Sequence, residues 1–238
     1  IKKMKKNNFS LYGLPGKVKF CKKCVNSNQR PNSDVEFKNT KDLKSGLKFE
    51  KNICTACHYN EIKKKIDWEK RELDLRKVLD KYRKKSGYDC VVPGSGGKDS
   101  GFTAHVLKYK YGMNPLTVTW APHLYTDIGW KNFINWSHKG GLDNILFTPN
   151  GRLHRLLTKL AFLNLLHPFQ PFIIGQKIIG PKIASKFNIP LVIYGENQAE
   201  YGNNIKENYN PVMDNSFFSF EKTSNLTFGK VNMKKIIK

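Results

Sequence analysis

The sequence predicts an α/β protein with a parallel, doubly wound sheet and a small N-terminal zinc-binding module held by four cysteines. Three observations lead to this prediction. Apolar, strand-like runs alternate with helical runs between residues 88 and 194; a turn rich in glycine and serine joins the first strand to a helix; and four of the five cysteines fall within residues 21–57. A chain of 238 residues is long enough for one main domain and one minor module.

The order of these signals divides the chain into four parts. We expect the zinc-binding module at residues 1–60, a connecting helix at 61–86, the main ATP-binding domain at 87–202 and a C-terminal segment without clear periodicity at 203–238. No run approaches the roughly 18–20 apolar residues that a membrane span needs, and no apolar stretch follows the Lys-rich start. We therefore expect a soluble, cytoplasmic protein.

The N-terminal 60 residues have too few apolar positions to build a core of their own. They contain two CxxC pairs, Cys21-Lys-Lys-Cys24 and Cys54-Thr-Ala-Cys57, separated by 29 residues. Four thiolates suit tetrahedral Zn²⁺, and metal binding would supply the missing folding energy. An iron–sulfur cluster remains an alternative, because four cysteines ligate both. A disulfide framework is not expected beside an ATP site in a chain without a secretory signal.

Strand and helix signals alternate through the main domain. Residues 61–85 carry a broken apolar face among charged residues, which predicts the connecting helix. Predicted strands cover residues 88–92, 115–121, 144–147 and 189–194, and predicted helices cover residues 99–111, 127–139, 153–166 and 172–187. Strands that alternate with helices at this spacing form a parallel sheet, which binds ligands at the carboxyl ends of its strands.

The glycine loop, Ser95-Gly96-Gly97-Lys98-Asp99-Ser100, falls at such an end. Its glycines let backbone N–H groups approach an anion, and the helix that follows adds the partial positive charge of its N-terminus. Lys98 can neutralise phosphate, the two serines can donate hydrogen bonds, and Asp99 can cap the helix or hold Mg²⁺. The string is not a Walker A loop, since Val92 and Asp99 occupy two of that motif's required positions. It resembles the signature of PP-loop ATP pyrophosphatases; an ordinary Gly-Ser turn is the alternative.

Further segments of this sequence match segments of one enzyme family, and they occur in the same order along the chain. They are Phe20-Cys21-Lys22-Lys23-Cys24-Val25, Ile66-Asp67-Trp68, Lys81-Tyr82-Arg83, Gly112-Met113-Asn114-Pro115-Leu116, and Lys186 to Leu191 running into Tyr194-Gly195-Glu196-Asn197. With the glycine loop and the second cysteine pair, they resemble the N-acetyl sugar amidotransferases of bacterial surface-polysaccharide and nonulosonic acid pathways. The segments Thr119 to His123 and Gln170 to Phe172 are most similar to members proposed for pseudaminic or legionaminic acid pathways. The likeness runs from about Phe20 to Gly202.

The resemblance implies conversion of a sugar acetamido group into an acetamidino group, with ATP and Mg²⁺. AMP transfer to the amide oxygen creates a leaving group that ammonia can displace. Family members are thought to receive ammonia from a glutaminase that works with a cyclase-like subunit. The family's further substrate-side sequence is not matched after Gly202, so the identity of the sugar is not predicted.

The resemblance also implies roles for single residues. The glycine loop would bind pyrophosphate, with Lys98, Asp99 and Glu196 as the candidate catalytic residues. Thr119 and Trp120, at the end of the second strand, would lie near the adenosine. Glu196 or Asn197 would contact Mg²⁺ or the substrate amide, although Glu196 also reads as a capping or solvent-facing residue. His123 could move a proton, but a structural role in its loop is at least an equal alternative. Tyr201 and Asn203 could touch the sugar or could equally be ordinary loop residues, while the apolar cluster Phe217, Phe218 and Phe220 is more typical of a core or subunit contact.

The basic composition keeps a second class of function open. The formal net charge is +23, which attracts nucleic acid or phosphorylated substrates, but 36 of the 42 basic residues are Lys and they are spread along the chain. A PP-loop enzyme that modifies tRNA, by thiolation or by a lysidine-type ligation, is therefore the main alternative. A thiolation enzyme should carry a reactive cysteine, whereas Cys90 reads as a small buried hydrophobe in a strand. A zinc-ribbon interaction module fused to a nucleotide sensor is a non-enzymatic alternative.

Overall fold

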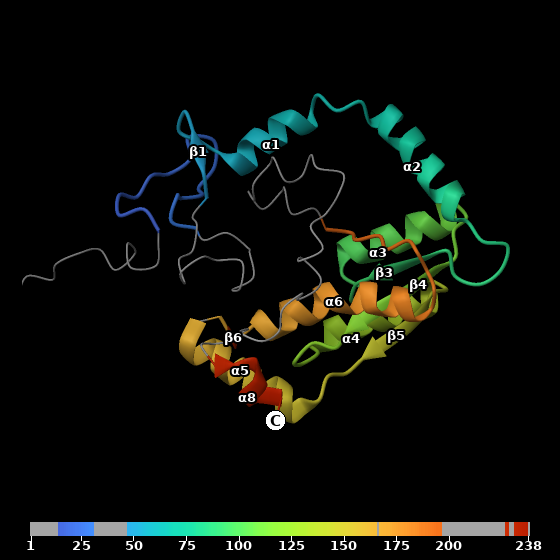
Figure 1. Ribbon diagram of the computed structural model, residues 1–238. Helices are drawn as coiled ribbons and strands as arrows, with labels where there is room; N and C mark the ends of the chain where they lie inside the picture. The colour runs from blue at the N-terminus through green and yellow to red at the C-terminus, as the bar shows by residue number, and fades with distance from the viewer. Residues whose placement is uncertain (1–13, 31–46, 166, 197–226, 229–230, 238) are drawn as a thin grey trace, which may run out of the picture. The chain divides into compact units, whose positions relative to one another are not determined.

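The computed structural model describes residues 14–30, 47–165, 167–196, 227–228 and 231–237 (Figure 1). The chain forms two compact units. Described residues up to Ile66 belong to the first, and Asp67–Glu196 with the described C-terminal residues belong to the second. Asn197, Tyr201, Asn203 and the three phenylalanines at 217, 218 and 220 lie outside the described residues.

The first unit is built on a short hairpin followed by a helix. Strands β1 (Phe49–Glu50) and β2 (Ile53–Cys54) pair antiparallel, and α1 (Thr55–Lys63) starts directly after β2. The two turn residues, Lys51 and Asn52, have φ angles of 48° and 65°. Positive φ at both positions matches the right-handed twist of the flanking strands, as in type I′ hairpins. The tight turn fixes where Cys54 ends β2 and where Cys57 enters the first turn of α1.

A parallel sheet forms the centre of the second unit, as the sequence predicts. Strands β3 (Cys90–Pro93), β4 (Pro115–Trp120) and β5 (Asp143–Phe147) lie in the order β3-β4-β5, with Val91 paired to Leu116 and Leu116 paired to Asp143. The predicted strand at 189–194 is reduced to a single parallel bridge, Val91 to Val192, on the other side of β3. All four residues of β3 and the first five of β4 are buried, which explains their continuous apolar runs.

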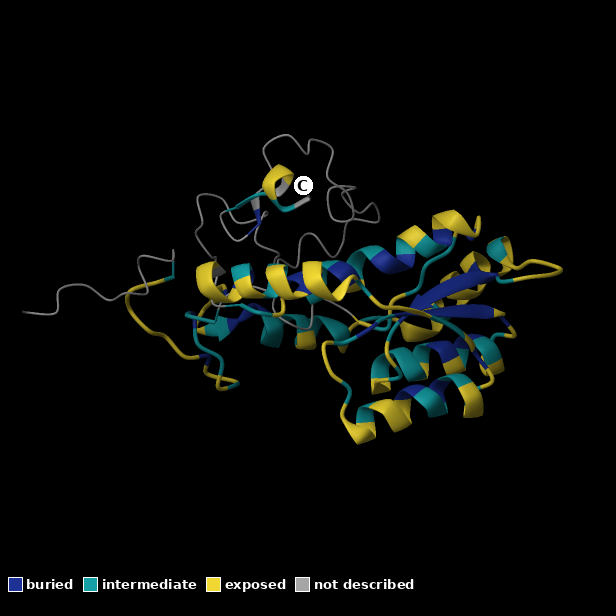
Figure 2. Ribbon diagram, turned by 90° about the horizontal axis from the view of Figure 1, so that it is seen from below, coloured by how far each residue is buried: buried dark blue, intermediate teal, exposed yellow. Residues whose placement is uncertain are grey.

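Helices cover both faces of this sheet (Figure 2). Helices α3 (Lys98–His105) and α4 (Asp127–Ile134) continue as π-helical turns η4 (Val106–Lys110) and η5 (Asn135–Lys139). They pack on the face that carries Cys90 and Val92, whereas α6 (Gln170–Lys186) packs on the face of Val91 and Val118. Helix α5 (Gly151–Leu165) follows β5 and contacts α6. The parallel sheet with helices on both faces, which the alternating pattern predicts, is therefore present.

The connecting segment differs from the prediction of one helix over 61–86. Helix α1 ends at Lys63, and a separate helix, α2 (Trp68–Tyr82), begins after four intervening residues and belongs to the second unit. The break has a local cause, because the Asp67 carboxylate accepts a hydrogen bond from the Lys70 N–H at 2.9 Å and caps α2. Near the C-terminus, β6 (Thr227–Phe228) and β7 (Val231–Asn232) form a short antiparallel pair before α8 (Met233–Ile237).

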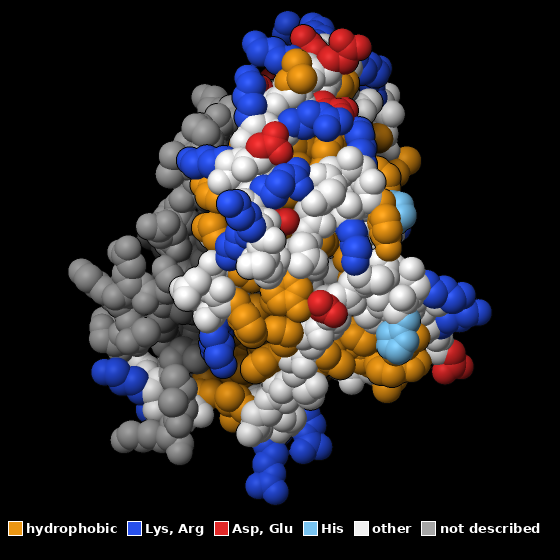
Figure 3. Space-filling model, turned by 90° about the vertical axis from the view of Figure 1, so that its right-hand side faces the viewer, with side chains coloured by type: hydrophobic (Ala, Val, Ile, Leu, Met, Phe, Trp, Pro, Cys, Tyr) orange, Lys and Arg blue, Asp and Glu red, His pale blue; other side chains and the backbone are white. Residues whose placement is uncertain are grey.

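Among the helices of the described ranges, none has both the length and the apolar character that crossing a membrane would require. On the face drawn in Figure 3, the Lys and Arg side chains are interspersed with acidic and hydrophobic ones and do not gather in a single patch.

Candidate metal centre and candidate anion site

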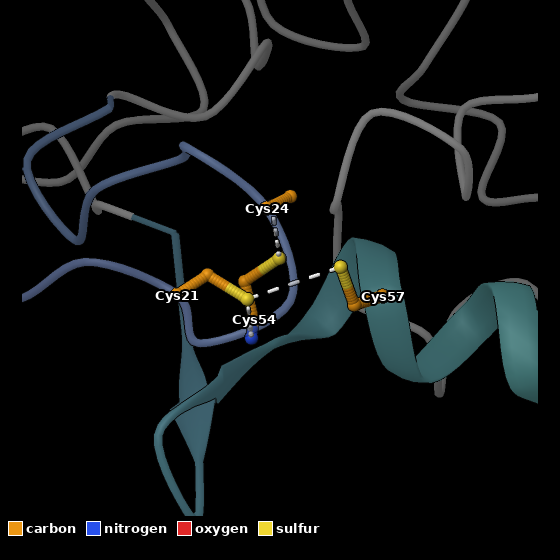
Figure 4. A group of neighbouring side chains, drawn as sticks. All are labelled: Cys21, Cys24, Cys54 and Cys57. Atoms are coloured by element: carbon orange, nitrogen blue, oxygen red, sulfur yellow. Dashed lines mark hydrogen bonds between the residues drawn. The ribbon is translucent and has the colours of Figure 1, made fainter.

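The two CxxC pairs converge on one point of the first unit (Figure 4). Cys21 and Cys24 come from the turn after residue 20, Cys54 ends β2, and Cys57 lies in the first turn of α1. The two halves are joined by the backbone, since the Lys22 N–H donates to the Asn52 carbonyl at 2.9 Å. Cys21 and Cys54 are buried and pack with Leu47 in the small core of this unit.

The spacing of the four sulfurs fits one metal ion. The Sγ atoms of Cys21 and Cys57 are 3.8 Å apart, those of Cys24 and Cys54 are 3.6 Å apart, and all four lie within 4.8 Å of one another. Zn–S bonds of about 2.3 Å in a tetrahedron place sulfurs about 3.8 Å apart. Disulfides would need Sγ atoms about 2.0 Å apart. A cluster of several irons needs more room, because its thiolates ligate different iron atoms.

Hydrogen bonds and burial give Cys21 a proton affinity different from those of Cys54 and Cys57. Burial raises the pKa of Cys21, but N–H groups of the surrounding backbone outweigh it and lower that pKa to about 6. Two of these donors are Cys54 N at 3.3 Å and Lys23 N at 3.4 Å from the Cys21 sulfur. Burial and the neighbouring thiols raise the pKa values of Cys54 and Cys57. Crowded thiols of this kind become thiolates when a cation binds between them.

His58 does not join the cysteine group. Its Nε2 atom lies 3.2 Å from the Glu50 carbonyl oxygen instead. Cys90, the fifth cysteine, is fully buried in β3, where burial raises its pKa to about 12. The prediction of a small buried hydrophobe at this position is confirmed.

The glycine loop (residues 95–100) follows β3 and Gly94 and leads into α3. The Gly94 N–H donates to the Val118 carbonyl at 2.9 Å, which ties the start of the loop to β4. Gly96 has a φ of 78°, the left-handed conformation that glycine adopts without strain, and Gly97 is the N-cap of α3. A side chain at Gly94 would collide with Ser100. The loop is therefore folded tightly onto the first turn of α3, with that turn's N–H groups lacking intrahelical acceptors.

Lys98 and Asp99 begin helix α3. Lys98 Nζ lies 2.6 Å from Asp99 Oδ1, and 88% of the Lys98 side chain is exposed, so the ammonium is accessible to an incoming anion. Asp99 does not cap the helix, since Gly97 holds that position, but it lies in the first turn. The Ser100 hydroxyl donates to the Gly97 carbonyl at 3.3 Å, while Ser95 is exposed. A flexible cation next to a folded glycine loop can bind a phosphate group.

Residues from the far end of the domain meet the same loop. A Cβ on Gly195 would lie 2.7 Å from the Asp99 carbonyl oxygen, so the segment that carries Glu196 passes directly over the start of α3. Glu196 itself is exposed. Thr119 and Trp120 end β4, as predicted, but the Thr119 hydroxyl is buried and accepts a hydrogen bond from Asn144 Nδ2 at 3.1 Å. Thr119 as a whole has no exposed surface, so its side chain does not face a ligand at this edge.

Sequence reasoning missed three residues near this edge of the sheet. Trp136, on η5, lies beneath the loop, with its Cη2 atom 3.1 Å from where a Gly94 Cβ would be. His154 and Gln170 are buried on α5 and α6. A tryptophan at helical spacing predicts only core, and a histidine between two arginines in a helix predicts a surface position. No signal in a single sequence distinguishes these positions.

Comparisons with known proteins give no assignment of activity. No protein-family model matches the chain. Over 81 residues the chain is 35% identical to an uncharacterized protein of Methanocaldococcus jannaschii, a stretch that covers 33% of this chain and 29% of that protein. The similarity therefore spans about a third of this chain and less than a third of that protein.

Proposed function

We propose that this chain is an ATP-dependent amidotransferase of the PP-loop class, which converts the acetamido group of a sugar into an acetamidino group. The observation that carries the proposal is the glycine loop. It follows a fully buried parallel strand, is folded onto the first turn of a helix, and has an exposed Lys98 at its rim. Parallel α/β sheets bind ligands at this edge, and such a loop suits the β- and γ-phosphates of ATP.

The proposed roles follow from the positions of the side chains. Lys98 would neutralise charge on the departing pyrophosphate, and Asp99 with Glu196 would hold Mg²⁺ or orient the substrate amide. The expected placement of Thr119 and Trp120 beside the adenosine is not part of this proposal, because Thr119 is fully buried and the Trp120 ring stacks on Phe147. An amide oxygen that has accepted AMP becomes a good leaving group, and ammonia then takes its place with release of AMP.

The cysteine module would act as a structural centre. Four cysteine ligands leave no open position on a tetrahedral metal, so bound zinc would stabilise the first unit and not activate a substrate. In this proposal the enzyme works in the cytoplasm, where ATP is available, in the biosynthesis of bacterial surface glycans such as pseudaminic or legionaminic acid. Ammonia would come from a glutaminase subunit with a cyclase-like partner.

The experiment that tests the proposal follows pyrophosphate and the sugar together. Purified protein is incubated with ATP, Mg²⁺, ammonium and a panel of acetamido sugars, free and nucleotide-linked, and the sugars are analysed by mass spectrometry. Replacement of an amide oxygen by NH makes the product about one mass unit lighter. Such a product with wild-type protein, and none with Lys98→Ala, is the expected result.

A tRNA-modifying enzyme is the second candidate, and the net charge of +23 favours it. The buried Cys90, with its raised pKa, does not support thiolation by a cysteine near the loop. Pyrophosphate release that needs tRNA and occurs with no sugar would replace the amidotransferase proposal with this one.

A further inference from the structure

A cluster of rings closes one edge of the sheet in the second unit. Trp120 at the end of β4 stacks on Phe147 at the end of β5, with ring centroids 5.0 Å apart. The His154 ring, on α5, lies 6.2 Å from the Trp120 ring and 4.6 Å from that of His123. The His123 ring in turn lies 6.1 Å from Phe169 and 5.8 Å from Phe172, the residues on either side of Gln170 and Pro171. Four segments of the chain therefore converge here.

Three polar atoms on the segments that meet here are buried without a hydrogen-bond partner. They are Trp120 Nε1, His154 Nε2 and Gln170 Oε1. His154 is only 8% exposed and Gln170 only 5%. A buried polar atom without a partner costs about 1–3 kcal/mol, so such atoms are rare and usually serve a bound group or a buried water. Tyr125 Oη, Trp136 Nε1 and Asn144 Oδ1 are further buried atoms of this kind. The three atoms on Trp120, His154 and Gln170 differ from them because their segments meet at one edge of the sheet, where one ligand could bond to more than one of them.

The donor and acceptor atoms of these side chains limit which functional groups the ligand can carry. The indole N–H can only donate and the Gln170 oxygen can only accept, so the ligand needs both an acceptor and a donor. Burial and the neighbouring His123 lower the pKa of His154, which keeps its imidazole neutral at pH 7 and removes any attraction for an anion. The ring walls favour an apolar substituent beside the polar atoms.

The rings also discriminate against a nucleobase. A base is usually held by stacking on an aromatic face, but Phe147 already stacks on the Trp120 indole. Gly175 of α6 lies so close to the fused rings that any side chain there would collide with them. Trp120 is therefore suited to donate a hydrogen bond from its N–H and not to stack a base.

We propose that Trp120, His154 and Gln170 form a subsite for an uncharged secondary amide that carries a small alkyl group. The amide carbonyl accepts from Trp120 Nε1–H, the amide N–H donates to Gln170 Oε1, and the alkyl group packs on the rings around His123. The inference deepens the proposed function, because it names the residues that recognise the acylamino group of the substrate. It rests on the proposed function for the identity of that substrate, but the binding needs neither ATP nor turnover.

The test is saturation-transfer NMR on the full chain with two probes, N-methylacetamide and N-acetylglucosamine; glucosamine, which lacks the amide, and adenosine are the comparison ligands. We expect saturation of the acetyl methyl group of both probes and none of glucosamine. Gln170→Met and Trp120→Phe should weaken probe binding about fivefold to tenfold, the loss of one hydrogen bond. His138→Gln, a change at an exposed histidine of η5, is the matched control and should bind as the wild type does.

Thermal unfolding separates a binding role from a structural one. If Gln170 serves a ligand, Gln170→Met removes an unsatisfied buried acceptor and leaves the melting temperature of the free protein unchanged or higher. A lower melting temperature with unchanged probe affinity would show that Gln170 bonds a buried water only. No methyl saturation with either probe, or adenosine binding that is lost in these variants, would also overturn the inference. Wild-type protein that binds both probes but never releases pyrophosphate would instead refute the proposed function alone.

Discussion

Gly96 of the glycine loop packs against the backbone of Asn132 in α4: a Cβ on Gly96 would lie 2.8 Å from the Asn132 carbonyl oxygen and 3.0 Å from the Phe133 Cα. The φ of Gly96 is 78°, so both the space and the backbone conformation require glycine. The loop is thus held between the helix that follows it and a helix from the next crossover. Such preorganised loops bind phosphate without reordering.

Gly96→Ala should therefore destabilise the protein by about 1–3 kcal/mol, because the new Cβ meets backbone atoms and the residue is forced into a disfavoured conformation. Gly97→Ala is the matched control and should cost less, since it meets no steric contact and only replaces a favoured N-cap residue. Gly97 has a φ of −65°, and its Cβ would meet nothing closer than 3.9 Å. Urea unfolding of the three proteins measures both effects. Equal losses in the two variants would show that the contact with Asn132 does not constrain the loop.

Lys98→Ala should reduce ATP-dependent pyrophosphate release about 10²- to 10³-fold, as the loss of a charge that stabilises a transition state does. Its effect on folding should be small, since the Lys98–Asp99 pair is exposed to solvent. Lys139→Ala removes another exposed lysine, at the end of η5, and should leave the rate unchanged. Steady-state rates and urea unfolding of both variants check the prediction. Equal rates in Lys98→Ala and wild type would remove Lys98 from the proposed mechanism.

The sequence was sufficient for the features that local patterns determine. Continuous apolar runs predicted β3 and β4 because both faces of these strands are buried, and the CxxC spacing predicted the cysteine group because two short turns bring four sulfurs together. Features that depend on tertiary contacts could not be predicted in this way. The 189–194 segment reads as a full strand, yet only Val192 forms a bridge with β3.

The burial of polar residues in helices was the other feature that the sequence did not predict. His154 lies between Arg152 and Arg155 in a segment that reads as solvent-facing, and Gln170 precedes a proline at the start of α6. Both side chains are buried only because α5 and α6 pack where β4 and β5 end. One sequence does not show which helices will meet, so buried polar residues of this kind become visible only in the structure.

The purified protein should contain one zinc ion per chain. Cys57→Ser should lose the metal, because three thiolates bind zinc much more weakly than four, and Cys90→Ala should keep it, since Cys90 lies in β3 of the second unit. Elemental analysis of the three proteins measures the content. A coloured protein that contains iron, or full metal content in Cys57→Ser, would contradict the assignment.

Metal affinity should also rise with pH. The raised pKa values of Cys54 and Cys57 mean that these thiols are protonated in the metal-free protein and must release protons when the ion binds. Competition with a chromophoric chelator at pH 6.5 and 8 checks the direction. Affinity that is constant over this range would show that the site is already deprotonated without metal.

Acidification should destabilise the second unit partly through His154. Burial and His123 hold the pKa of His154 below its ordinary value of about 6.5, so the folded protein keeps this imidazole neutral. As the pH falls through about 6.5, the unfolded chain binds a proton that the folded chain does not, and the free energy of unfolding decreases. The contribution of His154 is thus complete above that pH and is lost below it.

Tryptophan fluorescence can isolate this effect, because all four tryptophans (Trp68, Trp120, Trp130 and Trp136) belong to the second unit and none to the cysteine unit. Urea midpoints at pH 7.5 and 5.5 should differ less in His154→Gln than in the wild type. His138→Gln, at an exposed position, should keep the wild-type difference. Suppose that His154→Gln and His138→Gln show the same decrease in unfolding free energy between pH 7.5 and 5.5. The prediction would then be wrong, because protonation of a group other than His154 would cause the acid destabilisation.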